Sequence, residues 1–179
     1  MDILNDLFRE KSVCFSGHRP QRLPGRGEPD APETRELAAA LQRRISETVA
    51  RGMDTFINGY MAGFDILAAE QVVVLKAKHP QIRLISIAPF SVRYYEHAKC
   101  WTDEWIIRAN VICDLSDFSI SLSEHYMHGI YYERDRELVD RSGELICYWD
   151  GGSGGTKYTM DYARSKGLII HNLCKSGNR

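Results

Sequence analysis

The sequence has no long apolar run and almost no surplus of either charge. None of its apolar stretches approaches the roughly 20 residues that span a membrane. The first ten residues lack a cationic segment followed by an apolar one, so we predict a cytoplasmic protein with no signal peptide and no membrane partner. The net charge of −1 and the pI of about 6.6 argue against a general nucleic-acid binder, which usually carries a basic surplus.

Patterns typical of metal and disulfide sites are also missing. The five cysteines include no C-x-x-C pair, and three of them lie in apolar runs: Cys14, Cys113 and Cys147. We expect free, buried thiols in a reducing compartment. His97 and Cys100 have the spacing of metal ligands, but no second pair accompanies them. The sequence therefore predicts no metal site.

Three well-known nucleotide and nucleophile motifs are absent. The phosphate-loop pattern G-x-x-x-x-G-K-[ST] fails because Lys157 follows Thr156 instead of preceding it. The dinucleotide pattern G-x-G-x-x-G does not occur, which argues against an ordinary NAD dehydrogenase. Without a G-x-S-x-G turn, Ser16 and His18 do not suggest a hydrolase triad.

The sequence does contain short apolar segments that alternate with segments of helical periodicity. The length of 179 residues and an apolar content of 44% suit one domain, residues 1–179 with a core of about 11–173. The pattern predicts an α/β, Rossmann-like fold, with a mainly parallel sheet and helices on both faces. The predicted strands are 11–16, 55–58, 82–88, 111–115, 144–149 and 168–173. The predicted helices are 32–51, 65–78, 91–110, 125–141 and 156–166.

Glycine follows several of these predicted strands. Gly17-His18-Arg19 comes after the first, Gly59 to Gly63 and Asp65 after the second, Phe90 after the third, and Gly151 to Thr156 after the fifth. Parallel strands end at one edge of a sheet, where ligands bind. Glycine lets the backbone approach a phosphate, and a helix N-terminus attracts an anion. We therefore predict a phosphate site here. Asp65 either caps the helix it begins, which we favour, or contacts a ribose hydroxyl.

The order of these segments resembles the YpsA-like branch of the SLOG superfamily, which also includes the LOG cytokinin-activating hydrolases and DprA. The resemblance runs from Ser12 to Leu173 through CFSGHRP, FINGYMAGFDILAAEQVVVLK, RLISIAPF, RDRELVD and GGSGGTKYTMDYA. It implies a Rossmann-like fold that binds nucleotides or nucleotide-derived ligands. The ligand-facing positions that it implies are Gly17, His18, Arg19, Gly59, Gly63, Asp65, Arg134, Gly151, Gly152, Gly154, Gly155 and Thr156.

Two departures from the family pattern concern catalysis. The family often has Arg-Asn where this chain has Arg134-Asp135, and LOG hydrolases carry P-G-G-x-G-T-x-x-E with a catalytic glutamate. Thr159 stands in the place of that glutamate and cannot supply a carboxylate for glycosidic hydrolysis. Glu133 and Asp135, on either side of Arg134, are the candidate replacements.

The sequence thus favours binding or sensing of a phosphorylated ligand of the ADP-ribose, NAD or nucleotide type. We expect the base or ribose near His18, Tyr60 and Phe90, and the phosphates on the two glycine-rich loops, with Arg19 or Arg134 as counter-charges. No cofactor beyond such a ligand is required. The first alternative is a LOG-like nucleoside-monophosphate phosphoribohydrolase, and the second is DprA-like binding of single-stranded DNA. The exact ligand and a homo-oligomeric state stay open.

Overall fold

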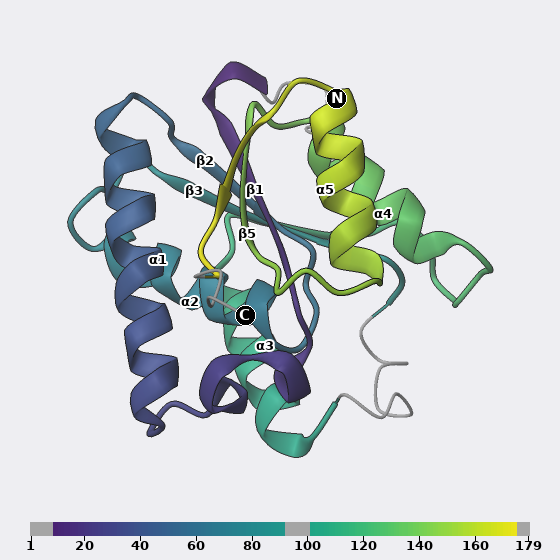
Figure 1. Cartoon of the computed structure of the whole chain (residues 1–179), viewed down its shortest axis with the longest axis horizontal. Helices are drawn as coiled ribbons and strands as arrows, with labels where there is room; N and C mark the ends of the chain where they lie inside the picture. The colour runs from purple at the N-terminus through teal and green to yellow at the C-terminus, as the bar shows by residue number, and fades with distance from the viewer. Residues whose placement is uncertain (1–8, 92–100, 175–179) are drawn as a thin grey trace.

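A computed structural model describes residues 9–91 and 101–174. Its described strands form one six-stranded sheet in the order β4-β3-β2-β1-β5-β6, with every neighbouring pair parallel (Figure 1). The fold class predicted from the sequence is therefore confirmed. The strands are β1 Ser12–Gly17, β2 Thr55–Asn58, β3 Arg83–Ala88, β4 Phe118–Ser121, β5 Glu144–Tyr148 and β6 Ile169–Asn172.

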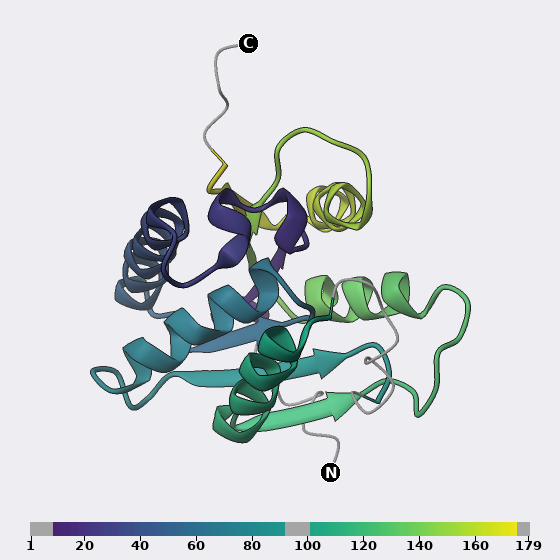
Figure 2. The same ribbon diagram turned by 90° about the horizontal axis from the view of Figure 1, so that it is seen from below.

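Helices cover both faces of the sheet. On one face α2 packs against α1 and α3, and on the other α4 lies beside α5 (Figures 1 and 2). Two short 3₁₀ helices, Pro20–Arg22 and Pro24–Gly27, fold the proline-rich segment after β1. The α-helices are α1 Pro32–Ala50, α2 Phe64–Lys76, α3 Asp103–Leu115, α4 Ile130–Asp140 and α5 Gly155–Ser165.

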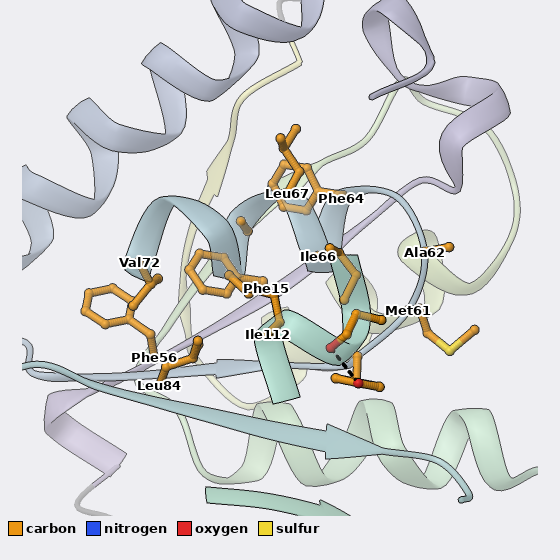
Figure 3. Packing of buried hydrophobic residues seen from close by; sticks show 14 of the residues in the cluster. Phe15, Phe56, Met61, Ala62, Phe64, Ile66, Leu67, Val72, Leu84 and Ile112 are labelled. Carbon is orange, nitrogen blue, oxygen red and sulfur yellow. Dashed lines mark hydrogen bonds between the residues drawn. The ribbon is translucent and has the colours of Figure 1, made fainter. Parts of the chain in front are cut away.

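Alternate residues of the inner strands pack into two separate apolar cores. On β1, Val13 and Phe15 join the core under α1 to α3, whereas Cys14 joins the core under α4 and α5. This is the period of two that a strand imposes when both of its faces are buried. Figure 3 shows the first core, where Phe15 and Phe56 lie near Val72 of α2. The two rings stack with centroids 6.1 Å apart.

The predicted fourth strand, residues 111–115, is wrong. These residues form the last turns of α3, and the strand follows at β4. The run Val111 to Leu115 is mostly apolar, but its buried and exposed residues alternate with the period of a helix. Ile112 is buried, while Val111 and Leu115, four residues apart, are 49% and 47% exposed. β4 lies at the sheet edge and is mostly exposed, so its sequence FSIS gives no apolar run.

Some helix boundaries also differ from those predicted. α4 begins at Ile130 instead of residue 125, because Gly129 adopts a left-handed conformation that ends the preceding turn. The preferred role of Asp65 as a helix cap is wrong, since Gly63 is the N-cap of α2 and Asp65 lies inside the first turn. Of the predicted helix 91–110, only the part from Asp103 onward belongs to α3, and residues 92–100, with His97 and Cys100, lie outside the described residues.

The strand order places a switch point beside β1. Successive strands add on one side from β1 to β4, and the chain then returns to add β5 and β6 on the other side. At such a point the connections leave the sheet in opposite directions and open a crevice beyond the strand ends, where ligands bind in open α/β sheets. In this protein the crevice lies between the ends of β1 and β5.

Candidate functional site

A cavity of about 380 Å³ opens at this switch point. The volume lies in the lower part of the range of about 300–1,000 Å³ that is usual for small-molecule pockets. Its walls come from the segment after β1, the start of α2, one side of α4 and the loop that leads into α5. The lining residues are Ser16, Gly17, His18, Arg19, Gln21, Arg22, Asp65, Tyr131, Arg134, Asp135, Ser153, Gly154, Gly155 and Thr156.

The N-terminus of α5 forms one end of the cavity. Gly154 is its N-cap, with a φ of 130° that only glycine adopts without strain, and the helix continues through Gly155 and Thr156. The first backbone hydrogen bond of this turn runs from the Tyr158 N–H to the Gly154 carbonyl at 3.1 Å. The N–H groups that precede it have no acceptor within the helix, and they carry the positive end of the helix dipole. This end of the cavity therefore attracts an anion.

Arg22 attaches the segment after β1 to the loop after β5. Its guanidinium donates to both carboxylate oxygens of Asp150, at 2.5 and 3.3 Å, and to the Ser153 carbonyl at 3.4 Å. The hydrogen bond from the Gly152 N–H, followed by that from Arg22, lowers the pKa of Asp150 to about 2. Asp150 is thus ionised at neutral pH and fixes the loop that carries the α5 N-terminus.

His18 is part of the same attachment. Burial, and after it the positive charge of Arg22, lower the pKa of the imidazole, whereas the nearby Asp150 carboxylate raises it. The lowered pKa favours a neutral ring, so Nε2 accepts a hydrogen bond from the Asp150 N–H at 3.2 Å. Asp150 Oδ1 also lies 2.9 Å from Nε2, but with a neutral ring this contact is not an ion pair.

Arg19 lines the cavity as a half-buried cation. Its side chain forms no hydrogen bond or ion pair with residues 9–91 or 101–174. Its charge nevertheless acts on Asp65, where it favours the ionised carboxylate. Arg19 is therefore available to a ligand anion in a way that Arg22, held by Asp150, is not.

A buried acid–arginine–acid cluster, Asp65–Arg134–Asp135, forms another part of the cavity wall, and Asp135 Oδ2 lies 4.0 Å from the position of a Cβ added at Gly155. Arg134 Nε lies 3.0 Å from Asp135 Oδ1, its Nη1 lies 3.4 Å from Asp65 Oδ2, and it also donates to the Gly59 carbonyl. All three side chains are at most 8% exposed. Burial raises the pKa of Asp65 to about 6, although Arg134 and Arg19 both oppose that shift. Two carboxylates are thus held in the cavity wall by one guanidinium.

The geometry of this site agrees with the comparison to known protein families. A model described as the YspA SLOG family (YpsA) matches residues 13–168. The chain belongs to this YpsA family. The resemblance inferred from the sequence motifs is thereby confirmed, and the match includes β1, the cavity-lining segments and α5.

Curated proteins similar to this chain share less than a third of their aligned residues with it. A UPF0398 protein of Macrococcus caseolyticus is 28% identical over 78% of this chain and 74% of its own length. The UPF0398 protein SH1465 of Staphylococcus haemolyticus is 24% identical over 82% of this chain and 76% of its own length. The SPbeta prophage-derived protein YoqJ of Bacillus subtilis is 27% identical over 66% of this chain and 73% of its own length.

Two solved structures share the fold. DNA processing protein A of Helicobacter pylori, described for its single-stranded DNA binding mode, aligns with a TM-score of 0.62 and 18% identity over 100% of this chain and 71% of that chain. The DprA of Streptococcus pneumoniae aligns with a TM-score of 0.60 and 15% identity, over 97% of this chain and 53% of that one. Identities this low support the Rossmann-like fold alone. No helix within the described residues is long and apolar enough to cross a membrane.

The cavity wall contains only some of the positions that the YpsA-like resemblance predicts to face the ligand. Gly17, His18, Arg19, Asp65, Arg134, Gly154, Gly155 and Thr156 line the cavity. Gly59 and Gly63, in the loop after β2, do not. A Cβ at Gly59 would overlap the Arg134 guanidinium, and one at Gly63 would lie 2.5 Å from the His18 carbonyl oxygen. These two glycines make room for cavity residues instead of forming a phosphate loop, which corrects the expectation that both glycine-rich loops face the ligand.

The residues expected around the base lie apart from one another. Phe90 is buried and does not line the cavity. It packs edge-on against Tyr131, which does. Tyr60 lines a different, smaller cavity beside β4 and donates its hydroxyl to the Ala109 carbonyl at 2.6 Å. Gly151 and Gly152 belong to the loop after β5 but are not in the cavity wall. Among the three predicted base or ribose contacts, only His18 reaches the cavity.

The structure separates the three positions considered for a catalytic carboxylate. Thr159 is fully buried and donates its hydroxyl to the Gly155 carbonyl at 3.0 Å, so it supports α5 from behind the cavity. Glu133 is exposed on α4 and is not in the wall. Asp135 is buried and lines the cavity. Of the two replacements proposed from the sequence, only Asp135 has the right location.

Several residues of the site were not predicted from the sequence: Gln21, Arg22, Tyr131 and Asp150. Arg22 lies in the proline-rich segment, which gives no periodic pattern, and Tyr131 occupies the first turn of a helix whose start was placed too early. Asp150 was visible as the residue between β5 and the glycine-rich loop. A carboxylate at that position is a signal for a loop attachment, because it can accept hydrogen bonds from the following backbone N–H groups.

Proposed function

We propose that this protein binds a phosphorylated, nucleotide-derived small molecule in the cavity beside β1, with a phosphate at the N-terminus of α5. Backbone N–H groups without an acceptor in the helix and the positive end of the helix dipole lie there, and a half-buried cation, Arg19, lines the same cavity. The observation that carries the proposal is this combination at the switch point of the sheet. We expect a ligand of the ADP-ribose, NAD or mononucleotide type, because the YpsA-like resemblance implies nucleotide-derived ligands and a cavity of about 380 Å³ is large enough for a small molecule.

Thermal unfolding with a ligand panel tests this proposal. AMP, ADP-ribose and NAD are compared with adenosine, which lacks the phosphate. A ligand at one hundred times its Kd adds about 2.7 kcal/mol and shifts the midpoint of a domain of this size by roughly 5–10 °C. We expect such a shift for at least one phosphorylated compound and a much smaller one for adenosine. If no compound moves the midpoint at millimolar concentration, the proposal is wrong.

A charge-matched pair of variants locates the anion. Arg19→Gln removes a cation in the cavity wall, whereas Arg164→Gln removes a cation at the other end of α5, where it pairs with Asp161 at 2.9 Å. We expect Arg19→Gln to weaken the phosphorylated ligand about tenfold, since a hydrogen bond to a charged group contributes about 1.5–3 kcal/mol. Arg164→Gln should leave the affinity unchanged. Equal effects would indicate a nonspecific charge effect.

Hydrolysis of a nucleoside monophosphate is the second candidate function, because Asp135 places a carboxylate in the cavity wall beside Arg134. General acid–base groups contribute about 10²–10⁴-fold to rate, and of the two carboxylates that flank Arg134 in sequence only Asp135 lies in the wall to replace the glutamate absent from α5. Chromatography of AMP and its N6-substituted relatives after long incubation tests the activity. Release of free base that is lost in Asp135→Asn and retained in Glu133→Gln would assign an enzyme.

The likeness to DprA structures also raises single-stranded DNA as a partner. Cations on and just after α5 are held in ion pairs: Lys157 and Arg164 share Asp161, and Lys166 pairs with Asp140. Cations held by carboxylates neutralise fewer phosphates, so we expect weak binding of DNA. Fluorescence anisotropy with a labelled oligo-dT at 150 mM salt tests this expectation.

A further inference from the structure

Two neighbouring parts of the cavity wall differ in chemistry, and only one of them suits a phosphate. The α5 N-terminus presents backbone donors, whereas the Asp65–Arg134–Asp135 cluster presents carboxylates. An ionised carboxylate accepts hydrogen bonds and donates none, so it offers a phosphate no partner. The cluster must therefore face a different part of any ligand that spans the cavity.

The net charge of the cluster limits which chemical group of the ligand can bind there. Arg134 contacts both carboxylates and offsets one negative charge, and Arg19, whose charge acts on Asp65, offsets the other. A site without net charge has no strong preference for a cation. An ionised carboxylate accepts hydrogen bonds but donates none. The matching ligand group is a neutral one with several donors.

The hydroxyls of a ribose fit this description. Two neighbouring hydroxyls bring two donors at a spacing that adjacent carboxylate oxygens can accept, and a carboxylate binds the ribose hydroxyl in other Rossmann folds. Asp65 and Asp135 come from different elements, α2 and α4, yet Arg134 brings both to the same wall. The cavity then offers backbone donors to a phosphate and, next to them, carboxylate acceptors to the sugar that carries it.

We propose that the Asp65–Arg134–Asp135 cluster binds the ribose hydroxyls of the ligand, so that the cavity takes ribonucleotides in preference to deoxyribonucleotides. This inference rests on the proposed function and names the sugar of that ligand. It separates this protein from a binder of DNA, whose sugar lacks the 2′-hydroxyl.

Calorimetric titration with matched sugar pairs tests the inference without any variant. The probes are AMP against 2′-deoxy-AMP, and ribose 5-phosphate against 2-deoxyribose 5-phosphate, which carry no base amino group. We expect AMP to bind at least tenfold more tightly than its deoxy form, because a lost hydrogen bond to a charged group leaves a buried acceptor without its partner. The sugar phosphates should show the same order.

Two variants and one control assign the preference to the cluster. Asp65→Asn and Asp135→Asn keep the shape of each side chain but replace an ionised acceptor with a weaker, neutral one. Each should reduce the ratio of the AMP and deoxy-AMP affinities severalfold. Glu133→Gln, an exposed carboxylate on the same helix as Asp135, should leave the ratio unchanged. Thermal midpoints without ligand establish that each variant is folded.

The outcomes distinguish this inference from the proposed function. Equal affinities for AMP and deoxy-AMP in the unmodified protein overturn the ribose assignment and leave phosphate binding standing. An undiminished ratio in both Asn variants overturns the assignment to this cluster. Failure of every phosphorylated probe to bind overturns both proposals together.

Discussion

The two glycine-rich loops beside β1 look alike in sequence but differ in structure. The loop after β2 is packed solid: Gly59 lies against Arg134, and Gly63 lies against the backbone of His18 and Arg19. The loop after β5 is open at Gly151 and Gly154, where a Cβ would meet no atom within 4 Å, whereas a Cβ at Gly152 would overlap the Arg22 guanidinium. Glycine in the first loop makes room for protein atoms, while Gly154 in the second lines the cavity and leaves room for a ligand. Glycine is therefore required at these two strand ends for two different physical reasons.

The largest difference should appear in stability. Gly63 and Gly151 both have positive φ, 105° and 95°, so replacing either with alanine introduces a similar backbone strain. Only at Gly63 would the new Cβ also meet backbone atoms, with the His18 oxygen 2.5 Å away. We expect Gly63→Ala to lower the free energy of unfolding by about 3 kcal/mol or more, and Gly151→Ala by about 1 kcal/mol. Urea unfolding of both variants measures this, and equal losses would contradict the comparison.

The next effect concerns affinity instead of stability. Gly155 has no positive φ, and the nearest atom to an added Cβ is Asp135 Oδ2 at 4.0 Å, so a larger side chain enters the cavity. Gly155→Val should weaken AMP or ADP-ribose at least tenfold, or about 1.4 kcal/mol, with little change in the thermal midpoint. Gly154 is less suitable for this test, because its φ of 130° adds strain to any substitution.

Ser165→Val, an exposed position at the other end of α5, is the control for Gly155→Val. It adds a similar side chain to the same helix away from the cavity. Calorimetry should find its affinity unchanged. A loss of affinity in Ser165→Val as large as in Gly155→Val would show that valine acts through the helix and not through the cavity.

The smallest effect is a pair of opposite pH dependences at the two loops. Burial raises the pKa of Asp65 to about 6, so between pH 6 and 4 the folded state binds more protons than the unfolded state. The unfolding free energy of the native protein relative to Asp65→Asn should therefore rise as the pH falls through that window. The pKa of Asp150 is lowered to about 2, so relative to Asp150→Asn the stability should fall between pH 4 and 2.

Urea unfolding of the native protein and both Asn variants at several pH values measures these slopes. Asp150 is 39% exposed, so solvent screens its interactions and its slope should be shallow. Slopes of the same sign at the two positions would contradict the assigned pKa directions.

The inner strands were predictable because they are buried on both faces. β1, β2, β3 and β5 read as short apolar runs, and a glycine or proline follows each within three residues. β4 was not predictable, since an edge strand needs no apolar run. The end of α3, with the sequence VICDL, resembled a strand instead. The order of the strands, and hence the position of the switch point, depends on long-range pairing that no local pattern records.

The site was predictable in part for a related reason. His18, Arg19 and the segment Gly154 to Thr156 lie next to strand ends, and the topology brings strand ends together. Arg22 and Tyr131 do not lie next to strand ends, so this rule does not predict them. The local sequence also does not tell whether a glycine contacts a ligand or a protein atom, and Gly59 shows the second case because its neighbour, Arg134, is 75 residues away in the chain.

The most direct test of the central claim is a titration of the isotope-labelled protein with AMP and ADP-ribose, followed by the backbone amide resonances. A phosphate at the N-terminus of α5 must perturb the N–H groups of that turn, because they lie closest to its charge. The account predicts the largest shifts at the amides of Gly155, Thr156 and Lys157, with small shifts at Gly59 and Gly63. Shifts centred on the loop after β2, or no saturable shift with either compound, would contradict it.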